Sequence, residues 1–286
     1  MKKALNISLV LLLTFVLFGF LTGCDDASGS SDDSTDTEQT TDDDTTTDDD
    51  TTTDDDTTTD DDTTTDDDTT TDSSVTIDFS DYTADSYLTE DDGVWVVNDD
   101  STSGATSTIV SMTQTDGTTG NALELSDQSL TTKPRVATLF STGETESGTI
   151  SVDVQYDSTN CAKASYIFLG TSDSASASSS ARFTELMTSA DTDSTTGEVT
   201  VDIQLRQASG DKDTIATVTA DEWHTVEMTW TATTLSVTID GTEYTTTEDG
   251  AALTLEGDVT PNGVTFYCGD NSNTGTTYYV DNVVVF

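Results

Sequence analysis

The chain has 286 residues, and its 56 aspartates and glutamates far outnumber its eight lysines and arginines, which gives a formal net charge of −48 at pH 7. Because nucleic-acid binding requires a basic face for the phosphates, this balance excludes DNA and RNA as partners. One histidine and three cysteines are too few to suggest a structural zinc site.

Residues 1–23 have the order of a secretory signal peptide. The basic start Met1-Lys2-Lys3 precedes an apolar run from Ala4 to Phe20, and Leu21-Thr22-Gly23-Cys24 ends it, an order typical of export signals. The alternatives are a transmembrane helix, for which the run is barely long enough, and an ordinary signal peptide with an incidental cysteine. The string Leu-Thr-Gly-Cys resembles a bacterial lipobox, which implies cleavage before Cys24, a lipid that includes palmitate on Cys24, and membrane attachment through that lipid alone.

Residues 24–74 form a polar linker. From Asp42 the chain repeats Asp-Asp-Asp-Thr-Thr-Thr, and Ala27 alone between Cys24 and Val75 can join a core, so we expect this segment to be disordered and extended by its like charges. At about 3.3 Å per residue its reach is at most about 165 Å, which favours the outer membrane or cell surface. Asp25 and Asp26 resemble an inner-membrane retention signal, so the periplasmic face of the inner membrane is the alternative location.

Residues 75–286 are rich in short alternating runs of Thr and Val, cut by Gly, Asn, Asp and Ser, which indicates strands. Asp240-Gly241 between two such runs predicts a hairpin, and no window predicts a long amphipathic helix. This many strands predict two stacked antiparallel sheets. The predicted strands are Val75–Phe79, Val94–Val97, Thr108–Gln114, Val136–Phe140, Thr149–Tyr156, Ser165–Leu169, Arg182–Met187, Val199–Gln207, Ile215–Val218, His224–Thr231, Leu235–Ile239, Thr242–Thr246, Val264–Cys268 and Thr277–Phe286.

Two stretches carry a resemblance to a known superfamily. The run Asp221–Tyr244, in which Trp223 opens a strand and a hairpin with Asp-Gly follows, resembles the laminin-G/concanavalin A-like jelly roll. The closing stretches Val264–Gly275 and Tyr279–Val283 resemble accessory domains found beside bacterial polysaccharide lyases and glycosidases. The resemblance implies an all-β, two-sheet antiparallel jelly-roll sandwich behind the acidic linker, and a carbohydrate-directed role.

Jelly rolls of this superfamily include alginate lyases, but the motifs of those enzymes are incomplete here. The chain has Arg182-Phe-Thr-Glu-Leu-Met187, with an extra residue between Arg and Glu, and Phe266-Tyr-Cys-Gly-Asp-Asn271 where a lysine and a tyrosine would stand. No Gln-x-His string and no glucanase-like Glu-x-Asp-x-x-Glu string occurs. His224, which follows Trp223, fits a structural position. We therefore predict a non-catalytic domain without catalytic residues, and a polysaccharide lyase or glycoside hydrolase is the alternative.

A sugar-binding site needs aromatic faces and polar side chains. The aromatic candidates are Trp95, Tyr87, Tyr166, Tyr267, Tyr278 and Tyr279, of which Trp95 and Tyr267 are included in the predicted site, whereas Trp223 and Trp230 are assigned to the core. The six cations of the domain all fall between residues 133 and 212. A shared concave face bearing Arg135, Lys163, Arg182 and Arg206 would bind a uronate carboxylate; the alternative is scattered ion pairs.

Two further structural features are expected. Cys161 and Cys268 form an even pair once Cys24 is lipidated, which predicts a disulfide in an oxidising compartment. The resemblance implies a structural calcium between the first and last strands, and the matching residues are Asp78 and Asp281. No other cofactor is expected.

The sequence therefore predicts a cell-envelope lipoprotein that displays a carbohydrate-binding jelly roll and captures a polysaccharide such as alginate or pectin. A structural or adhesive surface protein is a further alternative. The sequence predicts no particular oligomeric state.

Overall fold

The computed structural model describes residues 74–90, 94–173, 175, 177–270 and 275–286. These residues belong to one compact unit, Asp67–Phe286. The predicted signal peptide, the lipidation site Cys24 and the linker up to residue 73 lie outside the described residues. Within the described part, no helix is long and apolar enough to cross a membrane.

The described strands form two antiparallel sheets. Sheet A has nine described strands in the order β14 (Thr242–Tyr244), β13 (Leu235–Ile239), β12 (Trp223–Trp230), β7 (Gly148–Cys161), β16 (Thr276–Val285), β5 (Thr119–Asp127), β4 (Ala105–Thr113) and β2 (Ser86–Tyr87), with β1 (Val75–Ile77) paired to β16.

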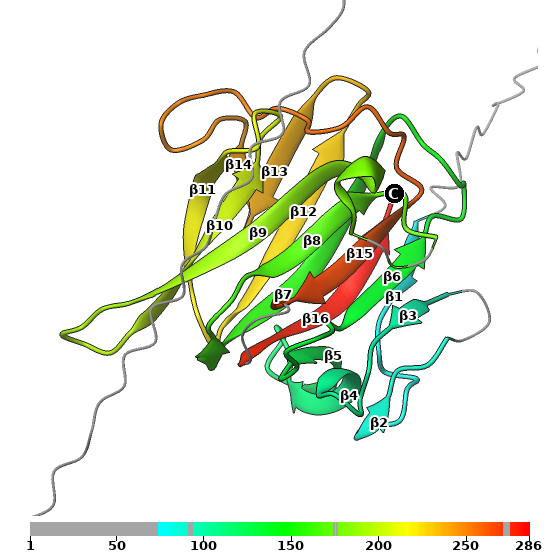
Figure 1. Cartoon of the computed structure of the whole chain (residues 1–286), viewed down its shortest axis with the longest axis vertical. Helices are drawn as coiled ribbons and strands as arrows, with labels where there is room; N and C mark the ends of the chain where they lie inside the picture. The colour runs from blue at the N-terminus through cyan, green and yellow to red at the C-terminus, as the bar shows by residue number, and fades with distance from the viewer. Residues whose placement is uncertain (1–73, 91–93, 174, 176, 271–274) are drawn as a thin grey trace, which may run out of the picture. The chain divides into compact units, whose positions relative to one another are not determined.

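Sheet B overlies sheet A and faces the viewer in Figure 1. Its seven described strands run in the order β11 (Lys212–Thr219), β10 (Val199–Arg206), β9 (Arg182–Thr192), β8 (Ser165–Gly170), β15 (Gly263–Cys268), β6 (Arg135–Leu139) and β3 (Val96–Asn98). The short 3-10 helix Ser179–Ala181 is the only helical element among the described residues. The predicted all-β, two-sheet antiparallel jelly-roll sandwich is confirmed.

Alternation along the strands builds the core between the sheets. In β10, Val201, Ile203 and Leu205 are buried, whereas the residues between them are partly exposed. Because successive side chains of a strand point to opposite faces, β10 contributes one apolar face to the core. The predicted hairpin at Asp240-Gly241 joins β13 to β14, and both residues have positive φ (50° and 78°), as a tight two-residue hairpin turn requires.

Trp223 differs from its predicted core position. In β12, His224, Val226, Met228 and Trp230 are buried, so the odd-numbered Trp223 lies on the opposite, outer face of sheet A. It is half-buried there, and its indole nitrogen donates a hydrogen bond to the carbonyl oxygen of Thr113 at 2.7 Å. Trp230 is in the core, as predicted.

Strand β5 was not predicted, although it lies inside sheet A between β16 and β4. Its apolar residues Leu123 and Leu125 face the core together with Asp127. Asp127 is tolerated there because its Oδ1 accepts the backbone N–H of Ser129 at 3.0 Å. A carboxylate at a core position breaks the apolar alternation from which strands are recognised in a sequence.

The predicted disulfide is wrong, because both described cysteines are free. Cys268 points into the core from β15 in sheet B, where its Sγ donates to the carbonyl oxygen of Leu125 at 3.4 Å. Cys161 ends β7 in sheet A, and its Sγ donates to the carbonyl oxygen of Ser158 at 3.6 Å. The two thiols belong to different sheets, and each contacts a carbonyl oxygen.

Candidate functional site

The outer face of sheet B, with the loops at its rim, gathers all the lysines and arginines of the described residues. Arg135 is paired in register with Tyr267, and Arg206 is paired with Lys212. We call this surface the cationic face. Its six cations are Lys133, Arg135, Lys163, Arg182, Arg206 and Lys212. The four residues that the sequence predicted to share a face therefore do so, and Lys133 and Lys212 join them.

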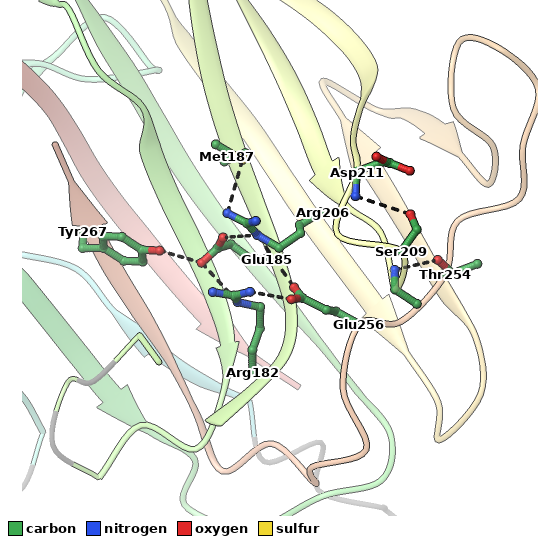
Figure 2. A network of polar contacts seen from close by, with 10 residues as sticks. Arg182, Glu185, Met187, Arg206, Ser209, Asp211, Thr254, Glu256 and Tyr267 are labelled. Atoms are coloured by element: carbon green, nitrogen blue, oxygen red, sulfur yellow. Dashed lines mark hydrogen bonds and ion pairs between the residues drawn. The ribbon is translucent and has the colours of Figure 1, made fainter. Parts of the chain in front are cut away.

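A buried carboxylate lies at the centre of this face. Glu185 on β9 is fully buried, and its Oε1 accepts the Nε hydrogen of Arg206 at 3.0 Å. Its Oε2 accepts the hydroxyl hydrogen of Tyr267 at 2.5 Å and lies 3.4 Å from Nε of Arg182. Figure 2 shows these side chains converging on Glu185. The hydrogen bond from Arg206 is charge-assisted, a strong and geometrically specific kind of bond, so it sets the position of Arg206, whereas Nε of Arg182 lies near Glu185 without a hydrogen bond.

A second carboxylate reaches the same arginines from a loop. Glu256 lies in the segment between β14 and β15, and its Oε1 accepts from Nη1 of Arg182 at 2.5 Å (Figure 2). Its Oε2 lies 3.8 Å from Nε of Arg206. The predicted alternative, ion pairs with the acids, is thus correct for these two arginines even though the cations also converge.

A β-bulge explains how Arg182 and Glu185 share one face although they are three residues apart. In the pairing of β8 with β9, Leu169 opposes Thr184 and Gly170 opposes Arg182, so Phe183 is the extra residue. A bulge inserts one residue into a strand and re-aims the side chains around it. Phe183 turns into the core. The bulge therefore accommodates the extra residue of the lyase-like string, Phe183, and keeps Arg182 and Glu185 on the same face.

Two tyrosines stack on the cationic face beside this network. The rings of Tyr166 and Tyr267 are nearly parallel, with centroids 4.1 Å apart. Tyr267 is only 5% exposed, and burial, with Glu185 next to it, raises the pKa of its hydroxyl, so it stays a hydrogen-bond donor. Tyr166 is half-buried and is the aromatic ring of this pair that a ligand can reach. Tyr267, which the sequence placed in the site, is buried and stacks against one face of the Tyr166 ring.

A polar pocket of about 350 Å³ opens next to Tyr166. Lys163 and Lys212 both line it, together with Gln204 and Asp270. Nζ of Lys163 lies 3.1 Å from Oδ2 of Asp270. The pocket thus combines an aromatic ring, an amide and two ammonium groups, one of which is paired with Asp270.

Lys133 and Arg135 extend the cationic face toward β6. Nζ of Lys133 lies 5.8 Å from the centre of the Tyr267 ring, within the range of a cation–π contact. Burial, and the neighbouring Arg135, lower the pKa of Lys133. The Nε of Arg135 is buried without a hydrogen-bond partner.

Trp95 is not part of this face, and the prediction that it binds a ligand is wrong. It is 2% exposed and stacks on Phe79 with ring centroids 5.4 Å apart. Its indole nitrogen donates to the hydroxyl oxygen of Tyr82 at 2.9 Å. A tryptophan side chain so deeply buried cannot stack on a sugar.

Asp78 and Asp281, the expected calcium ligands, lie near the junction of β1 with β16. Asp281 is buried, and its Oδ1 accepts the backbone N–H of Asn282 at 2.8 Å. Burial raises its pKa to about 6, and the neighbouring carboxylates Asp153 and Asp78 contribute. No group of three or more His, Cys, Asp or Glu side chains suited to a metal occurs among the described residues. Asp153 is also engaged, by the hydroxyl of Thr225 and the amide of Asn282. This arrangement does not fit a calcium site.

The chain's single histidine lies elsewhere. His224 is on β12 of sheet A, where Nδ1 is 2.7 Å from Oδ2 of Asp240 and Nε2 is 2.8 Å from the carbonyl oxygen of Thr219. Both ring nitrogens are engaged by neighbouring turns, which fits the structural position predicted for this residue.

Glu185, Glu256, Lys212 and Lys133 were missed as site residues. Glu185 stands in the lyase-like string, and that resemblance was the signal that could have identified it. Glu256 gives no signal in the sequence, because it lies in a loop and depends on contacts with residues about 50 and 74 positions away.

The comparisons with known proteins show no family. No protein-family model matches the chain, and no curated protein is significantly similar to it. A carbohydrate esterase from the Shiga toxin-encoding bacteriophage phi24B is 14% identical over 67% of this chain and 89% of its own, with a TM-score of 0.44. A glycoside hydrolase family 16 endo-glucanase from Bacteroides ovatus is 13% identical over 74% and 99%, with a TM-score of 0.43. An alginate lyase from Alteromonas sp. 272 is 13% identical over 68% and 93%, with a TM-score of 0.40. These scores assign neither a family nor an activity.

Proposed function

We propose that the cationic face binds an acidic polysaccharide, such as a uronate polymer of the alginate or pectin type, without chemical turnover. The observation that carries the proposal is the distribution of charge. Residues 75–286 contain 34 acidic and six basic side chains, and all six basic ones lie around the Tyr166–Tyr267 stack on one face. In so acidic a domain, that face is where an anionic polymer meets the least repulsion.

Each group on this face has a role in sugar binding. The exposed side of Tyr166 would stack on a pyranose ring. Lys163 and Lys212 would attract ring carboxylates, and Gln204 would hydrogen-bond hydroxyl groups in the same pocket. Because the domain's net charge opposes a polyanion, binding should depend on these local contacts and weaken steeply as salt rises.

The same geometry argues against turnover by the chain's single histidine or by Glu185. Lyase chemistry requires a base near the sugar ring, and His224 belongs to the other sheet. Glycoside hydrolysis requires two carboxyl groups that reach the scissile bond. Glu185 is fully buried, and each of its oxygens already accepts a hydrogen bond, so it cannot contact a glycosidic oxygen.

We further propose, from the sequence, that the domain is held at the bacterial cell envelope by a lipid on Cys24, with residues 25–74 as a spacer. An outer-membrane or cell-surface location would bring the cationic face to polymers outside the cell. Capture of a polysaccharide before its degradation by other enzymes would be the result.

The test is binding of the purified full-length chain to alginate and polygalacturonate, with dextran as a neutral polymer, by isothermal titration calorimetry. We expect binding to the two uronate polymers only. Lys163→Gln and Lys212→Gln should each weaken it about tenfold, as loss of a charge-assisted contact implies. Thr229→Glu, at an exposed position on the outer face of sheet A, changes the net charge equally and should have little effect. Equal effects of all three variants, or no binding by the wild type, would overturn the proposal.

A further inference from the structure

Glu256 accepts a hydrogen bond through only one of its two carboxylate oxygens, whereas both oxygens of Glu185 accept one. Oε1 of Glu256 accepts from Arg182, but its Oε2 is buried without a hydrogen-bond partner. The distance from that oxygen to Nε of Arg206 is 3.8 Å, too long for a hydrogen bond. A buried carboxylate oxygen without a donor is costly, so Glu256 is the weaker of the two anions on Arg206, although it is the one hydrogen-bonded to Arg182.

The backbone beneath Glu256 is fixed, whereas its side chain has a route to solvent. The N–H groups of Glu256 and Gly257 both donate to the carbonyl oxygen of Phe183, at 3.1 and 3.2 Å. Gly257 packs directly on the carbonyl of Arg182, where a Cβ atom would overlap it. The Glu256 side chain is 17% exposed. Rotation of the side chain alone is therefore enough to move the carboxylate away from the arginines.

We propose that Glu256 is an internal competitor for the arginines of the cationic face, and that the carboxylate of a bound acidic sugar displaces it. This inference rests on the proposed function of the face. In the unliganded protein, Glu256 pairs with Arg182 and covers it, and the Arg182 side chain is 9% exposed. A ligand carboxylate that reaches Arg182 and Arg206 replaces one anion with another, while Glu185 stays in place beneath.

The exchange makes the face selective. A neutral sugar has no anion to replace the Glu256 carboxylate, so it either leaves Glu256 in place and does not reach Arg182, or displaces Glu256 and leaves a buried guanidinium group poorly paired, which is costly. A carboxylated sugar restores the pairing, with two oxygens that match the planar donors of arginine. Discrimination then comes from the cost imposed on the wrong ligand as well as from contacts with the right one.

The test compares three variants of the full-length chain with polygalacturonate, by isothermal titration calorimetry. Glu256→Gln removes the competing charge, and Glu256→Asp keeps the charge but shortens the side chain. Glu248→Gln is the matched control, because Glu248 is an exposed residue of the same loop. We expect Glu256→Gln and Glu256→Asp to bind about fivefold more tightly than the wild type, the size of one competing ion pair, and Glu248→Gln to stay within about twofold.

The outcomes separate this inference from the proposed function. If the wild type does not bind the polymer, the proposed function fails. If the wild type binds but Glu256→Gln and Glu256→Asp bind no more tightly than Glu248→Gln, the internal competitor is overturned and the function stands. Should Glu256→Gln fold poorly by thermal unfolding, Glu256→Asp decides, because it leaves an anion in the loop.

Discussion

Tyr267 on β15 donates its hydroxyl hydrogen to Glu185 on β9, with 2.5 Å between Oη and Oε2, across the intervening strand β8. This contact links two stretches that are 82 residues apart in the sequence. It also ties the stacked tyrosines to the ion pairs of Arg182 and Arg206. The aromatic and cationic parts of the face are therefore one connected structure.

The first prediction concerns the stability of this connection. Tyr267→Phe should lower the free energy of unfolding by about 1–2 kcal/mol, because a buried carboxylate loses a donor. Glu185→Gln should lower it by about 3 kcal/mol, because two arginines lose the anion they share. Urea unfolding followed by fluorescence measures both. Tyr87→Phe and Glu198→Gln, at exposed positions, are the controls, and losses as large in the controls would contradict the prediction.

The second prediction concerns pH and Asp281, whose pKa is raised to about 6 by burial. Below about pH 4 the carboxyl is protonated in both the folded and the unfolded chain. Between about pH 4 and 6 only the unfolded chain loses the proton, so rising pH favours unfolding, and above 6 the penalty is complete. Asp281→Asn should therefore raise the free energy of unfolding at pH 8, by a value on the order of 2 kcal/mol, and this gain should vanish near pH 4.

The measurement for Asp281 is urea unfolding of the wild type and the variant from pH 4 to 8. Asp116→Asn is the control, because Thr118 lowers the pKa of that exposed carboxylate and its replacement should give no gain. A difference between the wild type and Asp281→Asn that does not change with pH would refute the assignment.

The third prediction concerns the free thiols. In a Cys24→Ala background, two thiols should react with Ellman's reagent in guanidinium under non-reducing conditions. In the folded protein Cys268 should be protected, because it is fully buried, and Cys161 should react slowly, because burial raises its pKa. Absence of reactive thiols in the unfolded protein would show that a disulfide forms after all.

The fourth prediction concerns the anchor. Cys24→Ala should abolish labelling by radioactive palmitate and release the protein from the membrane fraction, because the thiol that would carry the lipid is lost. Cys161→Ala is the control and should leave labelling unchanged. Palmitate labelling that persists in the Cys24 variant would exclude lipidation at this residue.

The sequence by itself determined the local elements of the domain. Alternation in β10 and the Asp-Gly pair after β13 predicted a strand and a hairpin that the structure contains. These features depend on neighbouring residues, and the side-chain period of a strand is visible in the sequence. The same period places Trp223 on the face opposite Trp230. The alternation in the sequence was therefore enough to show that Trp223 and Trp230 do not share the core face.

The tertiary structure alone decided which residues meet. Trp95 and Tyr267 are both aromatic and both lie in or beside strands. Trp95, however, stacks on Phe79 in the core, whereas Tyr267 donates a hydrogen bond to Glu185 on the cationic face. An even pair of cysteines suggested a disulfide, but both thiols are free, and each contacts a carbonyl oxygen instead. Glu256 reaches Arg182 only because the loop before β15 packs on the bulge at Phe183. Contacts of this kind depend on strand order, bulges and loop packing, which are set by the burial of the whole core and leave no local pattern in the sequence.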